Sequence, residues 1–329
     1  IVLVLGTLLT ISSHSWLGMW VGLEVNLLSF IPLISSIKNS LSSEASMKYF
    51  ITQAMASTVF MLSIIIMLPN NDLVNMMYLE NLNSIIMNSS ILTKMGAAPF
   101  HFWFPEVIEG LNWLNSLILL TWQKIAPMII LIYSLKEMKF IFIIIIFSMI
   151  ISGLLGINQI SLRKLLAYSS INHIGWMISS LLMVQSIWII YLMVYFIITM
   201  NLIMIFYKLN VFYMKQLISS MNNSKMVKVS FIVGFMSLGG LPPFLGFFPK
   251  WLVINFMIES KFILLSFLMI IFTLMTIYFY LRITFTTMIM SYSEVNFNIN
   301  GSNYSFLMVF MNFVSIIGLP ICMNIFSFI

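Results

Sequence analysis

The sequence predicts an all-α, polytopic membrane protein with about eleven transmembrane helices. Three observations lead to this prediction. The 329 residues are 61% hydrophobic and only 7% charged, whereas about a quarter of the residues of a soluble domain are charged. The mean hydropathy is +1.07. Apolar runs of about 20 residues, the length that crosses a bilayer, recur along the whole chain. We therefore expect one transmembrane domain over residues 1–329.

Five spans are expected between the start of the chain and residue 135. They cover residues 1–11, 16–36, 47–68, 82–109 and 111–135. The serine-rich segment 12–15 and the polar segment 37–46 separate the first three spans. The third span ends at the Pro-Asn-Asn-Asp run 69–72, because proline and asparagine favour turns.

Six further spans are expected in the rest of the chain. They cover residues 140–156, 165–184, 187–209, 229–258, 262–290 and 304–328. A basic loop between Lys208 and Lys228 follows the third of these, and the polar segment 291–302 precedes the last. When the loops are assigned alternately to the two sides, most lysines and arginines fall on one side. We therefore expect the amino terminus on the side of insertion and the carboxyl terminus on the opposite side.

Two spans contain a proline-rich interruption with the same spacing. One runs from Lys94 to Glu109 and includes Pro99 and Pro105, and the other runs from Gly239 to Trp251. Proline removes a backbone donor and clashes with the preceding turn, so both helices should break at membrane depth. Freed backbone groups are tolerated there only where protein or water covers them. Because the two spans are expected to cross in opposite directions, the matched breaks predict an inverted repeat with an ion site.

Four ionisable residues lie near mid-membrane by position in their spans: Glu24, Lys94, Lys124 and Lys250. A charge at the centre of a span costs roughly 2.5–3.5 kcal/mol, so we expect a polar interior around them. A buried lysine near a carboxylate can exchange a proton close to neutral pH, which favours a proton relay. The alternatives are static ion pairs, or lysines that extend to the interface. Lys94 is the expected partner of Glu24, the alternative being a solitary protonated carboxyl.

Other ionisable residues each allow two interpretations. His101 and His173 either bridge proton-transfer steps through water, since imidazole titrates near neutrality, or are hydrogen-bonded structural residues. Glu106 and Glu109 fall near the end of a span and are either solvated or part of a proton path. Arg282 is expected to be anchored near a polar cavity or the interface, because guanidinium rarely loses its proton.

Several classes of protein are excluded by what the sequence lacks. The single cysteine, Cys322, excludes an internal disulfide, and three histidines are too few for the usual zinc or iron–sulfur ligand sets. No glycine-rich nucleotide-binding loop is present. The net charge of +6 is better explained by loop asymmetry than by nucleic-acid binding, because no dense basic cluster occurs. We therefore expect neither a metal nor a cofactor in this chain.

Six motifs, taken together, resemble the antiporter-like membrane subunits of respiratory complex I. The motifs occur in the expected order over nearly the entire chain, at Trp20–Asn26, Glu44–Phe50, Lys94–Glu106, Leu120–Lys124, Arg163–Ser170 and Gly239–Trp251. The resemblance implies an antiporter-like domain in the mitochondrial inner membrane, with the amino terminus toward the matrix and the carboxyl terminus toward the intermembrane space. It implies that Glu24 and Lys94 form a coupled pair, that Lys124 is the central relay and that Lys250 is the terminal lysine.

The resemblance also implies a function and partners. We expect a core membrane-arm subunit of proton-translocating NADH:ubiquinone reductase, without a redox centre of its own. NADH, FMN, iron–sulfur clusters and ubiquinone are expected in partner subunits, and the expected contacts are other membrane-arm subunits, accessory subunits and phospholipids. Two alternatives stay open: a subunit of a multisubunit cation/proton antiporter, or a structural membrane-arm subunit whose buried charges guide assembly.

Overall fold

The computed structural model describes residues 1–36, 39–67, 76–221, 225–289, 310, 312–318 and 320. Within these ranges the chain forms fourteen α-helices and one 3₁₀ turn, and no strand. Six segments of this described part are long and apolar enough to cross a bilayer. The all-α membrane fold is thus confirmed for the described residues. The chain divides into an N-terminal unit, Ile1–Ser148, and a C-terminal unit, Met149–Ile329.

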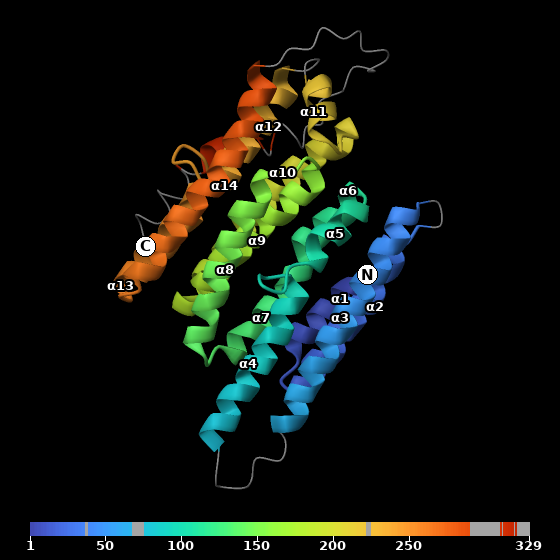
Figure 1. The fold of residues 1–329 in the computed structure, drawn as a ribbon, viewed down its shortest axis with the longest axis vertical. Helices are drawn as coiled ribbons and strands as arrows, with labels where there is room; N and C mark the ends of the chain where they lie inside the picture. Colours follow the sequence, from blue (N-terminus) through green and yellow to red (C-terminus); the bar gives the residue numbers. More distant parts are fainter. Residues whose placement is uncertain are drawn as a thin grey trace. The chain divides into compact units, whose positions relative to one another are not determined.

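The N-terminal unit is a bundle of helices (Figure 1). Its helices are α1 (Val2–Ser12), α2 (Trp16–Ile34), α3 (Ser40–Met67), α4 (Met76–Met95), α5 (Trp103–Gly110), α6 (Trp113–Leu120) and α7 (Ile125–Ser134), with the 3₁₀ turn η1 (Trp122–Lys124) before α7. Helix α3 contacts α2, α4 and α5, and α1 packs along α2. A Cβ atom at Gly22 would lie 2.7 Å from the Thr10 backbone nitrogen, so α1 and α2 approach closely because glycine is there.

The C-terminal unit is built around α9 (Leu162–Met183). The helix α8 (Met138–Ile157) precedes α9 in the chain. The helices after α9 are α10 (Gln185–Leu209), α11 (Met214–Met221), α12 (Lys225–Gly239), α13 (Phe247–Glu259) and α14 (Ile263–Ile289). Every residue from Leu165 to Leu181 is buried, and α9 contacts α10, α13 and α14. A helix that is buried on all sides forms the core of its bundle.

The structure corrects three sequence-based boundaries. The loop expected over residues 37–46 is wrong from Ser40 onward, where α3 begins. The Asn39 carbonyl accepts the backbone N–H groups of Ser42 and Ser43, so the serine-rich segment starts the helix. The basic loop after α10 contains the short helix α11, and the span over 111–135 is interrupted by η1.

Some sequence-based predictions lie outside the described residues. These are the positions of Lys38 and Cys322, the turn at 69–72, the loop at 291–302 and most of the last span, 304–328. The count of about eleven spans and the inverted repeat therefore stay predictions.

Candidate functional site

The first helix break lies between α4 and α5, and a glycine ends α4 there. Gly96 has φ +74°, a conformation that costs other residues about 1–2 kcal/mol. The Gly96 N–H donates to the Thr93 carbonyl at 3.2 Å and the Ala97 N–H to the Leu92 carbonyl at 3.1 Å. This pair of bonds is the Schellman motif that ends many helices. A Cβ at Gly96 would also lie 3.1 Å from the ring of Phe104.

The second break, between α12 and α13, repeats this geometry. Gly240 has φ +76°, its N–H donates to the Ser237 carbonyl at 3.0 Å, and the Leu241 N–H donates to the Met236 carbonyl at 3.3 Å. The next helix restarts after the same number of residues in both breaks. Both predicted breaks are confirmed, but a left-handed glycine ends each first helix before the prolines are reached.

A proline stands at the third position of the helix that follows each break. Pro105 occupies this position in α5 and Pro249 in α13. Proline fits the first turn of a helix because the N–H groups there have no partner within the helix. Pro127 is the third residue of α7, which follows the 3₁₀ turn. Pro127 is therefore the signal that could have located this third interruption from the sequence.

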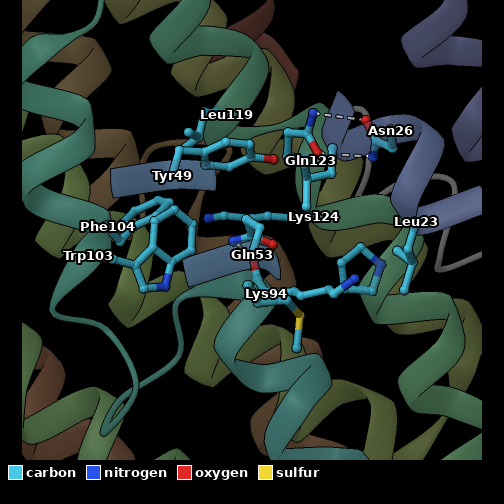
Figure 2. A pocket seen from close by; sticks show the side chains of 13 residues that line it. Leu23, Asn26, Tyr49, Gln53, Lys94, Trp103, Phe104, Leu119, Gln123 and Lys124 are labelled. Atoms are coloured by element: carbon cyan, nitrogen blue, oxygen red, sulfur yellow. Dashed lines mark hydrogen bonds between the residues drawn. The ribbon is translucent and has the colours of Figure 1, made fainter. Parts of the chain in front are cut away.

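Lys94 and Lys124 line one small cavity in the N-terminal unit (Figure 2). Its volume is about 20 Å³, and a cavity needs about 10–15 Å³ to hold a water molecule. Asn26, Gln53 and Gln123 contribute polar groups, which a bound water requires. The other residues of the wall are Leu23, Leu27, Tyr49, Met95, Trp103, Phe104, Leu119 and Pro127.

Lys94 lies in the last turn of α4 and is 8% exposed. A cation is favoured in this turn because the unpaired carbonyls give the helix end a partial negative charge. The backbone carbonyl of Lys94 accepts a hydrogen bond from Gln53 Nε2 of α3, at 3.4 Å. The side-chain amide thus satisfies a carbonyl at the end of α4.

Lys124 ends the turn η1 and is 2% exposed. Its Nζ lies 6.0 Å from the ring centroid of Phe104, within range of a cation–π interaction. The glycine at position 96 leaves room for this same ring. The first break and the environment of Lys124 are therefore coupled through Phe104.

Glu24 lies on α2, near this cavity but not on its wall. The electric field of its carboxylate acts on Lys94, yet among the described residues the salt bridges within 4.0 Å do not include this pair. The buried Glu24 Oε2 has no hydrogen-bond partner in the described part of the chain. Glu24 and Lys94 therefore interact at a distance, and their role as a coupled pair stays a prediction.

Lys250, in the C-terminal unit, docks on the end of the preceding helix. It is 7% exposed, and its Nζ donates to the Gly239 carbonyl at 2.8 Å and to the Leu238 carbonyl at 3.3 Å. The ring of Trp176 lies 5.9 Å from this nitrogen. The carbonyl end of α12 therefore partly compensates the charge of the ammonium group. Leu238 matches Lys94 in the first break, so Gln53 and Lys250 bind equivalent carbonyls.

His173 lies at the centre of α9 and is buried. Its Nδ1 is 2.9 Å from the hydroxyl of Tyr191, and its ring centroid is 4.9 Å from that of Tyr195. Both tyrosines are on α10. Nothing in the sequence around His173 indicates these aromatic partners, because they lie on a neighbouring helix.

The remaining candidate residues are either more exposed or bonded to residues nearby in the sequence. Glu106 is exposed and forms a 2.7 Å salt bridge with Lys48, which also pairs with Glu44 at 2.9 Å. His101 Nδ1 lies 3.2 Å from the Pro99 carbonyl. Arg282 is exposed and Glu109 partly buried. Within the described ranges, no three histidine, cysteine, aspartate or glutamate side chains gather into a metal site; the absence of a cofactor stays a prediction.

Comparison with known proteins decides the family. The chain is 45% identical to the NADH-ubiquinone oxidoreductase chain 2 of Anopheles gambiae over 326 residues, which cover 97% of this chain and 94% of that protein. It is 46% identical to the chain 2 of Locusta migratoria over 294 residues, covering 89% and 85%. The chain belongs to the NADH-ubiquinone oxidoreductase chain 2 family.

Two further matches agree with membership in the chain 2 family. Residues 13–277 match the membrane family described as NADH:quinone oxidoreductase/Mrp antiporter. A chain of respiratory complex I from Thermus thermophilus has the same fold, with a TM-score of 0.85 at 23% identity, covering 97% of this chain and 76% of that one. The resemblance found in the sequence motifs is therefore confirmed at the level of family and fold.

Proposed function

We propose that this chain is a core membrane-arm subunit of respiratory complex I in the mitochondrial inner membrane, where it couples NADH-to-ubiquinone electron transfer to proton translocation. The relay consists of Glu24, Lys94, Lys124, His173 and Lys250. The assignment to this complex is supported by the names of the similar insect proteins, NADH-ubiquinone oxidoreductase chain 2. One observation carries the relay: Lys94, Lys124 and Lys250 are almost fully buried, and each lies at an interruption of a helix.

Backbone carbonyls at helix ends allow a buried lysine to be charged without a carboxylate in contact. A charge at mid-membrane costs roughly 2.5–3.5 kcal/mol, and hydrogen bonds to charged groups each return about 1.5–3 kcal/mol. Lys250 makes two such bonds. The bonds therefore offset the cost of burying the charged form of this lysine. A lysine in this balance can pass a proton when the charge on a neighbour changes.

Lys94 and Lys124 are the pair best arranged for a proton transfer step. They line the same small cavity, and its polar wall can order a water molecule (Figure 2). A change at Glu24 alters the field on Lys94 and so alters how readily Lys94 donates. In the C-terminal unit, the proposed relay residues are Lys250 and His173, and the matched breaks favour an inverted repeat. We further propose that the amino terminus faces the matrix.

Replacing Lys124 by methionine in the assembled complex tests the relay. In liposomes, with ubiquinone as electron acceptor, Lys124→Met should lower the number of protons pumped per NADH oxidised. Lys139→Met is the matched control, because Lys139 lies at the exposed start of α8. An intact Lys124→Met complex with an unchanged ratio would refute the relay.

The family description also includes Mrp antiporters, which favours a cation/proton antiporter subunit as the second candidate. Purification of the native chain together with an NADH-oxidising activity separates the two. A merely structural role predicts a third result: the Lys124→Met complex is less abundant, but the surviving complexes pump normally.

A further inference from the structure

A reciprocal pair of amide side chains lines the cavity that Lys94 and Lys124 share. Asn26 Nδ2 donates to Gln123 Oε1 at 3.0 Å, and Gln123 Nε2 donates to Asn26 Oδ1 at 3.0 Å. The two bonds form a closed ring, drawn as dashed lines in Figure 2. The residues are 97 positions apart in sequence, and Asn26 is 3% exposed. This pair therefore joins α2 directly to the turn η1.

Each member of the pair lies close in the sequence to a residue of the proposed relay. Asn26 lies two residues after Glu24 on α2, and Gln123 immediately precedes Lys124. Inside η1, the Lys124 N–H reaches the Thr121 carbonyl at 3.3 Å, a long bond, as expected of 3₁₀ geometry. The backbone alone therefore fixes this turn weakly. The two side-chain hydrogen bonds between Asn26 and Gln123 add a restraint on this turn, and so on the backbone position of Lys124.

Primary amides suit a site in which charges move. They do not titrate, so the ring of hydrogen bonds persists whether a neighbouring lysine is protonated or neutral. Each amide has two N–H donors and an oxygen with two lone pairs, and the ring uses one donor and one lone pair. The remaining capacity can serve the cavity that both residues line.

We propose that Asn26 and Gln123 are positioning residues for proton transfer between Lys94 and Lys124. They hold η1 against α2 so that the Lys124 side chain enters the same cavity as Lys94. This inference rests on the proposed relay function. It adds that the transfer rate depends on the amide ring, which carries no proton itself.

The experiment compares matched variants in the assembled complex, with NADH-driven proton uptake into liposomes normalised to the amount of complex. Asn26→Leu and Gln123→Met each remove one amide at similar volume and leave the other unpaired, and each should slow uptake about tenfold. Exchanging the pair in the double variant Asn26→Gln with Gln123→Asn keeps the ring and should restore most of the rate and its pH profile. Ser29→Ala on α2 is the control, because it removes only a local hydroxyl bond.

Two results would overturn the inference. One is that the single variants pump like Ser29→Ala, or lower only the amount of complex. The other is that the exchange gives no rescue. In a Lys124→Met background, Asn26→Leu should have no further effect, since it acts through Lys124. If Lys124→Met itself leaves pumping unchanged, the proposed relay fails instead, so the two failures are distinguishable.

Discussion

Replacing Gly240 by alanine should displace the Lys250 ammonium from its docking site. A Cβ at this position would lie 2.8 Å from Lys250 Cδ and 3.0 Å from Nζ. The positive φ adds a backbone strain of about 1–2 kcal/mol. If the lysine stem moves away, it loses its bonds to the Gly239 and Leu238 carbonyls, each worth about 1.5–3 kcal/mol because the donor is charged. Losing even the weaker bond reduces the docked population about tenfold.

The adjacent glycine provides the control. A Cβ at Gly239 would meet only Ile277 Cγ1 and Tyr280 Cδ2, both at 3.6 Å, which is ordinary van der Waals contact. Gly239→Ala therefore makes the same chemical change one residue away without touching Lys250. In liposomes, NADH-driven proton uptake per assembled complex should fall about tenfold in Gly240→Ala and stay close to wild type in Gly239→Ala. Equal uptake by the two variants would refute the docking of Lys250 as a requirement for pumping.

Two further predictions concern helix packing in the N-terminal unit. Gly22→Ala should force α1 and α2 apart, because the new Cβ would lie 2.5 Å from Thr10 Cγ2 and 2.7 Å from its backbone nitrogen; we expect a loss of about 1–3 kcal/mol, read as less assembled complex on a native gel. Gly110→Ala should separate α5 from α3, since its Cβ would overlap the Leu41 carbonyl oxygen; a lower melting temperature of the purified complex would be the readout. Melting or assembly equal to that of Gly239→Ala would contradict either prediction.

The helix breaks could be predicted from sequence because their causes are local. A left-handed glycine and a proline in the next first turn lie within a few residues of each other, as at Gly96 and Pro105. The buried lysines were also predictable, since charges stand out in an apolar chain. The prediction was wrong about which residue ends the first helix. Glycine ends that helix, and proline lies in the first turn of the helix that follows.

The partners of the buried charges could not be predicted, because they come from distant parts of the chain. Nothing near Gln123 indicates that its amide meets Asn26, and nothing near His173 indicates Tyr191. The docking of Lys250 on Gly239 also required the path of the backbone through the break. The interruption before α7 had a sequence signal in Pro127, yet a proline in a first turn is compatible with several local structures.

Using backbone carbonyls as partners for buried lysines has a consequence for proton transfer. A carboxylate in contact would hold a lysine strongly in its charged form, and it could itself take up the proton. A helix carbonyl end carries only about half a negative charge and does not titrate. Lys250, bound to two such carbonyls, can therefore lose its proton without leaving an opposite full charge buried beside it. In the proposed relay, Glu24 would modulate the charge of Lys94 from a distance, through its field. The proposed relay therefore assigns the holding of the buried charge to backbone carbonyls and its modulation to a carboxylate.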